Sequence, residues 1–375
     1  MSVLRAQAHV DLHAIEDNVA LLRQKAGSAL TMAVVKADGY GHGLLPAAHA
    51  ALAGGADWLG VAVLDEALAL REAGVTTPLL CWLAVPGESL ADGIRHDVDL
   101  SVSSVWSLSE TVAAARAEGR AARIHLKIDT GLSRNGCPAA GWAELVRAVA
   151  AAQAEGAVTA VGIWTHFAYA DAPGHPTIAA QLEAFREAVD VARANGVTPQ
   201  LRHVANSAAT LTLPDARFDL VRPGIAVYGL SPVPEQGSFG LRPAMTLSAR
   251  VALAKRMPAG TGVSYAHRYV TERETTLALV PLGYADGVPR NATNCGPVLL
   301  GGRRRTVAGT VCMDQFVVDV GDDPVAEGDE VVLFGPGHGA EPTAQDWADT
   351  VGSIHYEIVT RIGARVKRTY SGGSE

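Results

Sequence analysis

Between residues 31 and 230 the chain alternates eight short apolar runs with longer segments at helical spacing. Nearly continuous apolar strands indicate a parallel sheet buried on both faces. Eight strand–helix units predict an N-terminal (β/α)8 barrel of the TIM type, with an open doubly wound sheet as the alternative. The runs are TMAVVK (31–36), DWLGVAV (57–63), PLLCWLA (78–84), DVDLSVS (97–103), RIHLKID (123–129), AVGIWTHF (160–167), QLRHVAN (200–206) and LVRPGIAVYG (220–229).

The connecting segments carry helix signals, and the pattern changes after about residue 240. SSVWSLSETVAAARAEG (103–119) begins with serines suited to a helix N-cap and ends at a glycine. Beyond residue 240, Val-, Thr- and Leu-rich segments are separated by Gly, Pro and Asp turns. This predicts a mostly-β C-terminal domain. We place the boundary in SPVPEQGSFGLRP (231–243), which gives domains of 1–236 and 237–375.

Charge and cysteine usage exclude several classes of protein. The chain has 31 basic and 39 acidic residues, a net charge of −8, and no basic stripe, so nucleic-acid binding lacks its main attractive term. Charged residues interrupt each apolar stretch near the N-terminus, so neither a signal peptide nor a membrane span is predicted. The four cysteines are scattered without a CxxC pair, which predicts no metal site and a cytoplasmic, reducing location.

Lys36 closes the first apolar run, at the strand end where barrel enzymes place catalytic groups. Desolvation by the preceding apolar residues lowers the pKa of such a lysine and favours its neutral amine. A neutral amine can form a Schiff base with an aldehyde. The ordinary alternative is a surface lysine that extends from a strand end into water.

Residues near the last two strands have the chemistry of a phosphate site. Ser207 follows the seventh run, and Arg222, Gly224 and Ile225 lie in the eighth. Loops after strands seven and eight are the usual phosphate site of a barrel. Residues 39–43, Gly-Tyr-Gly-His-Gly, could add amides and a phenol, although a tight turn explains them as well. The structural alternatives are a helix cap for Ser207, a bulge for Gly224 and a surface ion pair for Arg222.

Eight blocks of sequence, taken in order, resemble the alanine racemase family over almost the whole chain. They are VVKADGYGHG (34–43), HLKIDTGLSRNG (125–136), THFAYAD (165–171), VRPGIAVYG (221–229), GVSYAHRY (262–269), LGYADG (282–287), VCMDQ (311–315) and YEIVTRI (356–362). The resemblance implies a (β/α)8 barrel, a C-terminal β domain, pyridoxal 5'-phosphate as cofactor and a homodimer with shared active sites. The implied reaction interconverts L-alanine and D-alanine, which supplies D-alanine for peptidoglycan.

Racemisation removes the α-proton from one face of the substrate and returns a proton to the other, so it requires two acid/base groups. The resemblance implies that these are Lys36 and Tyr265 of the partner subunit. A phenol with a pKa near ~10 is a weak base at neutral pH and needs support. The family places His166 and Arg222 behind this tyrosine. Arg222 can only donate to the pyridine nitrogen, which weakens the electron sink and disfavours transamination.

The same resemblance assigns the remaining site residues. An unmodified Lys127 would repel Arg134, which gives an electrostatic reason for the carbamate that several relatives carry at this lysine. The cofactor-binding positions are Lys36, Tyr40, His166, Asn206, Ser207, Arg222, Gly224, Ile225 and Tyr356, and the substrate-binding positions are Arg134, Met313 and Tyr284.

Two departures from the family pattern and three alternative functions accompany this interpretation. Asp38-Gly39 stand where Asn-Ala is common, and His355 precedes Tyr356 where other residues are usual. A serine or broader-specificity racemase remains open, because one methylene changes discrimination by only about 1–3 kcal/mol. A non-catalytic pyridoxal-phosphate carrier would resemble the first domain alone. A sugar-phosphate barrel enzyme would use the phosphate site without a Schiff base.

Overall fold

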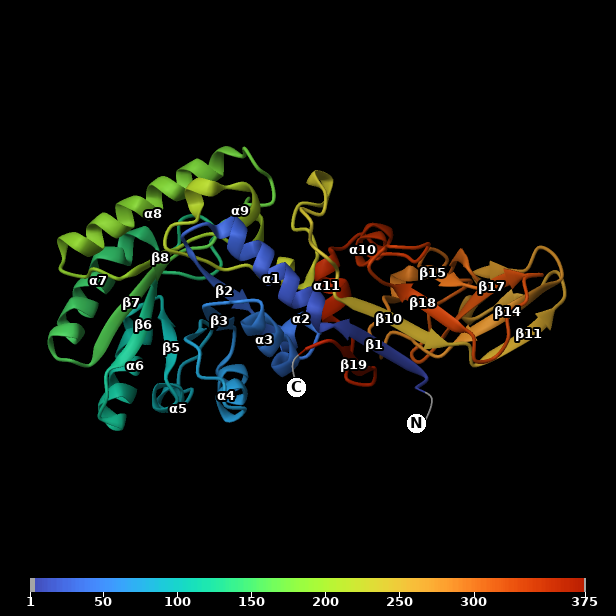
Figure 1. Cartoon of the computed structure of the whole chain (residues 1–375), viewed down its shortest axis with the longest axis horizontal. Coiled ribbons are helices and arrows are strands. Elements are labelled where there is room, and N and C mark those ends of the chain that lie inside the picture. Colours follow the sequence, from blue (N-terminus) through green and yellow to red (C-terminus); the bar gives the residue numbers. More distant parts are fainter. Residues whose placement is uncertain (1–3, 374–375) are drawn as a thin grey trace. The chain divides into compact units, whose positions relative to one another are not determined.

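The computed structural model describes residues 4–373, and Figure 1 labels most of their helices and strands. The chain splits into two compact units. One comprises Ile15–Gly39 and Leu44–Leu241, and the other comprises Tyr40–Gly43, the described residues up to Ala14 and those from Arg242 onward. Each unit therefore combines segments that are distant in sequence. We keep the division into 1–236 and 237–375 as a proposal for the functional domains.

The larger unit contains an eight-stranded parallel sheet in the order β8-β7-β6-β5-β4-β3-β2-β9. The amide of Asp219 donates to the carbonyl of Arg202 at 3.1 Å, and the amide of Arg222 donates to the carbonyl of Ala205 at 2.8 Å. These bonds join the two outer strands, so the sheet is a nearly closed barrel and the predicted fold is confirmed. The strands are β2 (Leu30–Val34), β3 (Trp58–Val61), β4 (Leu79–Cys81), β5 (Val98–Val102), β6 (Ala122–Lys127), β7 (Val158–Trp164), β8 (Leu201–His203) and β9 (Leu220–Val221).

The eighth predicted run is a strand over only two residues. Pro223 lacks an amide hydrogen, so the ladder cannot continue through it. The following residues form the 3₁₀ helix η2 (Ile225–Tyr228), which ends at Gly229. The expectation of a strand over 220–229 was therefore too long, and this early end places Gly224 just before η2 and Ile225 at its first position.

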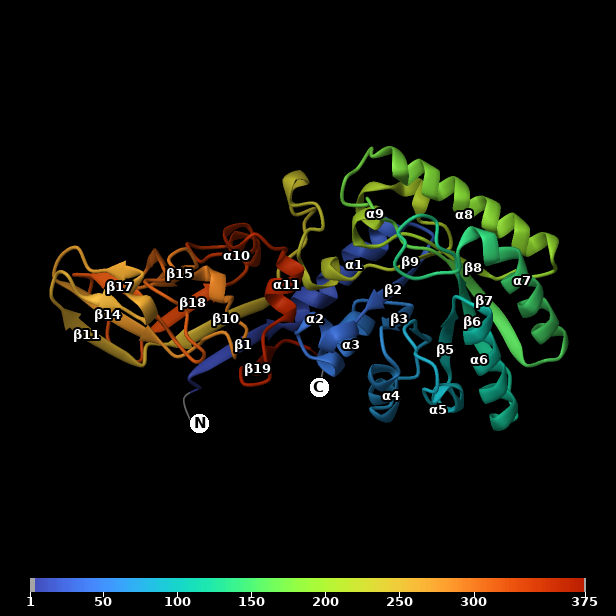
Figure 2. The ribbon, with the colours of Figure 1, turned by 180° about the vertical axis from the view of Figure 1, so that it is seen from behind.

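Helices connect the strands and cover the outside of the barrel, as α7 and α8 do beside β7 (Figure 2). The predicted helix at 103–119 is confirmed: Ser104 accepts from the amide of Ser107, and Gly119 ends the helix at a φ of 64°. None of the helices formed by residues 4–373 has both the length and the apolarity to cross a bilayer. The helices are α1 (Leu12–Ala26), α2 (Lys36–Tyr40), α3 (Leu44–Ala53), α4 (Leu64–Glu72), α5 (Leu90–Arg95), α6 (Val105–Glu118), α7 (Ala139–Ala154), α8 (Pro176–Ala194) and α9 (Ser207–Thr212).

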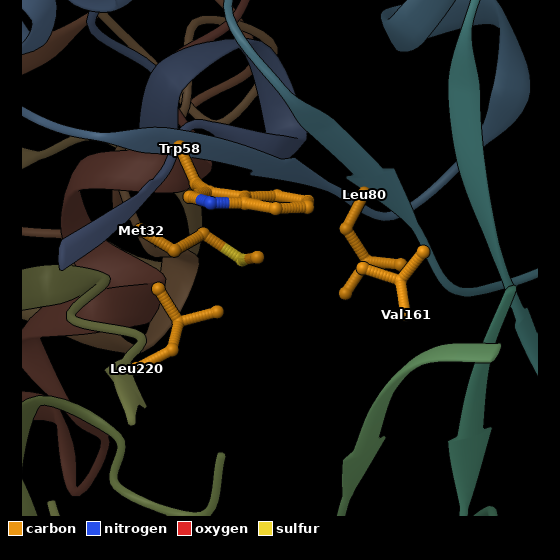
Figure 3. Packing of buried hydrophobic residues seen from close by; sticks show 5 residues of the cluster. All are labelled: Met32, Trp58, Leu80, Val161 and Leu220. Atoms are coloured by element: carbon orange, nitrogen blue, oxygen red, sulfur yellow. The ribbon is translucent and has the colours of Figure 1, made fainter. Parts of the chain in front are cut away.

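Apolar side chains from several strands fill part of the barrel interior. Figure 3 shows Met32, Trp58, Leu80, Val161 and Leu220 extending toward one another from different strands. All five are buried. Burying apolar surface contributes roughly 25 cal/mol per Å², so this packing stabilises the barrel that carries the strand-end residues.

The smaller unit is rich in strands, as predicted. Its main sheet has the order β16-β15-β18-β10-β1-β19, and β11-β14-β17 and β12-β13 form two further sheets. β1 (Ala6–Asp11) pairs antiparallel with β10 and parallel with β19, a pairing that the sequence analysis did not foresee. The other elements are β10 (Met245–Arg250), β11 (Leu253–Met257), β12 (Gly262–Val263), β13 (Tyr269–Val270), β14 (Thr275–Val280), β15 (Pro297–Leu300), β16 (Arg303–Thr306), β17 (Phe316–Gly321), β18 (Glu330–Phe334), α10 (Ala344–Val351), α11 (His355–Thr360) and β19 (Lys367–Ser371).

Candidate active site

Lys36 lies just beyond the end of β2 and begins the short turn α2. Burial, followed by the positive charge of Arg134, lowers the pKa of Lys36, while Glu66 opposes the shift. The Nζ atom lies 6.0 Å from the centroid of the Trp82 ring. A lysine in this setting holds a larger fraction of neutral amine than one in water, which is the form that bonds to an aldehyde.

The turn after Lys36 has an unusual backbone that its neighbours hold in place. Ala37 and Asp38 have φ values of 54° and 53°, a left-handed conformation that non-glycine residues rarely adopt. The amide of Ala37 donates to Glu66 Oε1 at 2.5 Å, and Asp38 Oδ1 accepts from the amide of Leu44 at 2.8 Å, at the start of α3. The aspartate that departs from the family pattern therefore caps a helix and orders the loop.

Arg222 is buried and is surrounded by acceptors from neighbouring strands. Its Nη2 donates to the carbonyl of Thr165 at 2.9 Å and that of Val204 at 3.2 Å, and lies 3.4 Å from His166 Nδ1. Its Nη1 lies 3.2 Å from His203 Nδ1. Burial lowers the pKa of Arg222 to about 9, so the guanidinium remains charged and can only donate at neutral pH.

Four cationic side chains influence one another electrostatically in the larger unit: Lys36, Lys127, Arg134 and Arg222. Burial, then Arg222 and Arg134, lower the pKa of Lys127 to about 7. Burial followed by all four cations lowers the pKa of His166 well below its usual range, so this imidazole is neutral. Such a concentration of positive charge suits an anionic ligand.

The loop that carries Arg134 is ordered by a residue that the sequence analysis did not single out. Asp129 Oδ1 accepts from the amides of Gly131, Leu132 and Ser133 at 2.9 to 3.1 Å. An aspartate followed by Thr-Gly after a strand is an Asx-turn signal that could have identified it. His203 was also missed, although a histidine at the end of a buried strand marks it as a candidate.

Ser207 and Gly224 lie together at the end of the barrel strands. Ser207 Oγ accepts from the amides of Gly224 at 2.8 Å and Ala226 at 3.3 Å. Asn206 caps α9, because its Oδ1 accepts from the amide of Ala209 at 3.0 Å. Ile225 follows Gly224 and begins η2. The amides of Gly224 and Ala226 thus converge on one acceptor, and a phosphate oxygen in its place would suit the same donors together with the Ser207 hydroxyl.

The remaining site residues of the sequence analysis lie in the smaller unit. The ring centroids of Tyr40 and Tyr356 are 6.5 Å apart. Tyr265 and Met313 line a pocket of about 290 Å³, together with Ser264, Cys312, Asp314 and Gln315. The amide of Tyr284 donates to the carbonyl of Cys312 at 3.0 Å, which places Tyr284 beside the Met313 segment.

The backbone around Tyr265 is held in a strained conformation. Ser264 and Ala266 have φ values of 61° and 59°. Ser264 Oγ donates to the carbonyl of Thr310 at 2.7 Å, and Thr310 Oγ1 donates to the carbonyl of Tyr265 at 2.9 Å. Strain that reciprocal hydrogen bonds maintain is common at functional sites. The Tyr265 side chain is 71% exposed in the single chain.

His355 departs from the family pattern and has a local structural role. Its Nδ1 lies 2.7 Å from Gln345 Oε1, and burial lowers its pKa to about 4. The imidazole is therefore neutral and donates through Nδ1. This bond joins α10 to α11, the helix that carries Tyr356.

These donors fit a phosphorylated aldehyde cofactor. The amine of Lys36 suits the aldehyde, the hydroxyl of Ser207 and the nearby amides suit a phosphate, and the guanidinium of Arg222 suits an aromatic nitrogen that accepts a hydrogen bond. The fold and the donor set together define a barrel enzyme of the pyridoxal-phosphate class.

Comparison with known proteins identifies the family. Residues 10–232 match the alanine racemase N-terminal domain, and residues 244–370 match the C-terminal domain. The chain is 64% identical over 370 residues to alanine racemase of Frankia casuarinae, covering 98% of this chain and 96% of that one. The chain belongs to the alanine racemase family, whose members depend on pyridoxal phosphate.

Solved structures agree with this assignment. The crystal structure of alanine racemase from D-cycloserine producing Streptomyces lavendulae is 57% identical, with a TM-score of 0.98 and coverage of 100% of this chain and 99% of that chain. The structure of alanine racemase from Bacillus anthracis, with bound L-Ala-P, is 35% identical, with a TM-score of 0.92 and coverage of 100% and 97%. Both confirm the predicted barrel and strand-rich second part.

Proposed function

We propose that the chain interconverts L-alanine and D-alanine with Lys36 and Tyr265 as the acid/base groups for opposite faces of the substrate. The observation that carries this proposal is the desolvated amine of Lys36 at a barrel strand end, in a chain of the alanine racemase family. When bound, pyridoxal phosphate withdraws electrons from the α-carbon and so acidifies its proton. One residue then takes that proton while the other returns one to the opposite face.

Arg222 and His166 tune this chemistry in our proposal. Arg222 stays a donor toward the pyridine nitrogen because its guanidinium keeps its protons at neutral pH. Because this donor keeps its proton, the ring takes up less negative charge than it would with a protonated nitrogen. Prompt return of the α-proton is therefore favoured over transamination. The neutral His166 accepts from Arg222 at Nδ1, so its proton lies on Nε2 and is available to donate to the phenolate oxygen of Tyr265. His166 and Arg222 therefore support the phenolate form as a pair.

The other residues bind and orient in this proposal. Ser207 and the amides of Gly224 and Ile225 hold the phosphate from the barrel side, and Asn206 fixes the helix start that carries Ser207. Tyr40 and Tyr356 add phenols, and Arg134, Met313 and Tyr284 bind the substrate carboxylate and narrow the entrance. The proximity of Tyr40 to Tyr356 and of Ser207 to Gly224 supports these roles.

We further propose a homodimer in which Tyr265 of the partner subunit completes each site. An aromatic side chain that is 71% exposed in one chain, on a strained and hydrogen-bonded loop, is suited to contact another subunit. The four cysteines all carry free thiols, which is compatible with the cytoplasmic location proposed from the sequence.

Chiral analysis of the products tests the activity and the substrate together. Incubating the holoenzyme separately with L-alanine and with L-serine should yield D-alanine at a much higher kcat/KM than D-serine. Comparable values for both amino acids would instead establish the broader-specificity racemase. Loss of both amino acids without any D-enantiomer would contradict racemisation altogether.

Lys127 is expected to carry a carbamate. Its pKa of about 7 leaves much of the amine neutral at physiological pH, and this form attacks carbon dioxide to give a carbamate and release a proton. The added negative charge replaces repulsion of Arg134 by attraction. Protein equilibrated with ¹³C-bicarbonate should show a carbamate carbon resonance that is missing from Lys127→Gln and retained in the exposed control Lys25→Gln. The same spectrum from wild type and Lys127→Gln would refute the modification.

A further inference from the structure

A line of hydrogen-bonded polar side chains crosses the interior of the barrel. Asp99 Oδ2 lies 3.1 Å from His125 Nε2, His125 Nδ1 lies 2.8 Å from His203 Nε2, and His203 Nδ1 lies 3.2 Å from Arg222 Nη1. All four residues are buried. They come from β5, from β6, from β8 and from just beyond β9, so the line links the start of one strand to the far ends of others.

The chemistry of the two ends fixes the direction of every hydrogen bond in this line. A guanidinium has only donors, so His203 Nδ1 must accept from Arg222. Burial, followed by the positive charge of Arg222, lowers the pKa of His203 well below its usual range, so this imidazole is neutral and its proton lies on Nε2. His203 then donates to His125 Nδ1, and His125 Nε2 donates to the carboxylate. An ionised carboxylate can only accept. The guanidinium at one end and the carboxylate at the other therefore require the same donor-to-acceptor direction along the line.

The backbone makes room for the contact between the two histidines. A Cβ at Gly162 would lie 2.2 Å from His125 Nδ1 and 2.9 Å from His203 Nε2, so any other residue at 162 would displace the pair. The pairing of β6 with β7 shifts register between Ile124 and His125, which places Gly162 opposite His125. Such bulges redirect side chains, and they are common beside functional sites.

Two tryptophans fix the imidazole rings. Trp164 stacks on His203 with ring centroids 5.6 Å apart and planes 6° apart, and Trp164 Nε1 donates to Ser101 Oγ at 3.0 Å. Trp58 meets His125 edge-on at 5.5 Å. Neither ring can therefore rotate to exchange its hydrogen-bond partners without moving a large neighbour.

The line connects the guanidinium of Arg222 to the negative charge of Asp99. Among the residues that the structure describes, no carboxylate forms an ion pair with Arg222. At the other end of the line, Arg123 holds Asp99 with two hydrogen bonds of 2.6 and 3.1 Å. Burial alone would raise the pKa of Asp99, but His125 and Arg123 lower it overall, so the carboxylate stays ionised.

We propose that Asp99, His125 and His203 are positioning residues that form a one-way donor chain, which holds Arg222 in one orientation and stabilises its positive charge. This inference deepens the proposed function, because Arg222 is the residue assigned there to the pyridine nitrogen. Hydrogen bonds in such a chain polarise one another, so a change at Asp99 reaches Arg222 without contact between them.

Two substitutions break the chain at different points. Asp99→Asn keeps the shape and removes the charge. His125→Asn keeps an acceptor for His203 in place of Nδ1 and loses the link to Asp99. Asp219→Asn is the matched control, because Asp219 also accepts two hydrogen bonds from the side chain of one arginine, Arg202, but forms no hydrogen bond with either histidine.

The first measurement does not depend on activity. Nitrogen-15 NMR of histidine-labelled holoenzyme at neutral pH should show two histidines that are protonated on Nε2 alone. Asp99→Asn should shift both signals, and Asp219→Asn should leave both unchanged. A protonated Nδ1 in either residue, or signals that do not respond to Asp99→Asn, would overturn the chain.

The second measurement tests the action on Arg222. Asp99→Asn and His125→Asn should each lower kcat by about 10-fold, with KM for alanine nearly unchanged, as expected for outer positioning residues. The alkaline limb of the kcat profile should move to lower pH, since the guanidinium loses stabilisation of its charged form. Wild-type kcat and an unmoved limb in a folded variant would refute the positioning role. If wild-type holoenzyme fails to racemise alanine, the proposed function fails, while the NMR result still decides the chain.

Discussion

Replacing Lys36 by alanine should lower racemisation by at least about 10,000-fold. The substitution removes the amine that we propose both bonds to the cofactor and moves the α-proton on one face, and general acid/base catalysis alone contributes about 100- to 10,000-fold. Binding of the cofactor through its phosphate should survive, because Ser207 and the amides near Gly224 are untouched.

Borohydride treatment locates the covalent bond directly. Wild-type holoenzyme should be yellow, and reduction should remove the band and fix the cofactor on Lys36, as peptide mass analysis would show. Lys25→Ala, which changes an exposed lysine of α1, should behave as wild type. A colourless wild-type protein after cofactor addition, or label on another lysine, contradicts the assignment.

Replacing Tyr265 by phenylalanine should lower the rate of α-proton exchange much more on one face of the substrate than on the other. In the proposed two-base arrangement, the variant keeps Lys36 to exchange the α-proton of one enantiomer, while exchange from the other should fall by about 100-fold or more. Racemisation rates cannot reveal this asymmetry. Enantiomers have equal free energies in water, so kcat/KM is the same in both directions for every variant.

Proton NMR in deuterated water measures the exchange of each enantiomer separately. Tyr269→Phe provides the matched control, because it removes a phenol from β13 that donates to Asp319 at 2.8 Å and lies outside the pocket of Tyr265. Tyr269→Phe should change the free energy of unfolding more than it changes the rate of α-proton exchange. Small and equal effects of Tyr265→Phe on both enantiomers would rule out the two-base assignment.

Mixing the two inactive variants tests whether sites are shared between subunits. A dimer with one Lys36→Ala subunit and one Tyr265→Phe subunit would contain one doubly altered site and one intact site. Random reassembly should then restore about a quarter of wild-type activity, because half of the dimers are mixed and each has one working site. If both residues came from the same chain, neither site would be intact and no activity would return.

The barrel could be predicted from sequence because each strand has a local signal. Apolar runs such as TMAVVK form strands in place, and the alternation with helices implies a parallel sheet. β1 could not be placed in the same way. Its pairing with β10 and β19 depends on residues more than 200 positions away, and AQAHVD carries no local signal for that choice.

The residues of the candidate site were predicted one by one, but the residues that hold them in place were not. Lys36 and Ser207 follow strand ends that can be located along the sequence. The contact between His125 and His203 depends on a bulge opposite Gly162, which is a property of two strands in register. In the sequence alone, a histidine inside a strand is most simply explained as a core residue. The hydrogen-bonded line to Asp99 could therefore be identified only from the structure.

The position of β1 in its sheet has a consequence for biosynthesis. This strand is synthesised before the barrel segments, yet both of its neighbours, β10 and β19, are translated after them. Domains generally begin to fold as they emerge, so the barrel can form during translation. β1 must therefore wait without its two sheet partners until β10 and β19 have been synthesised, after the whole barrel.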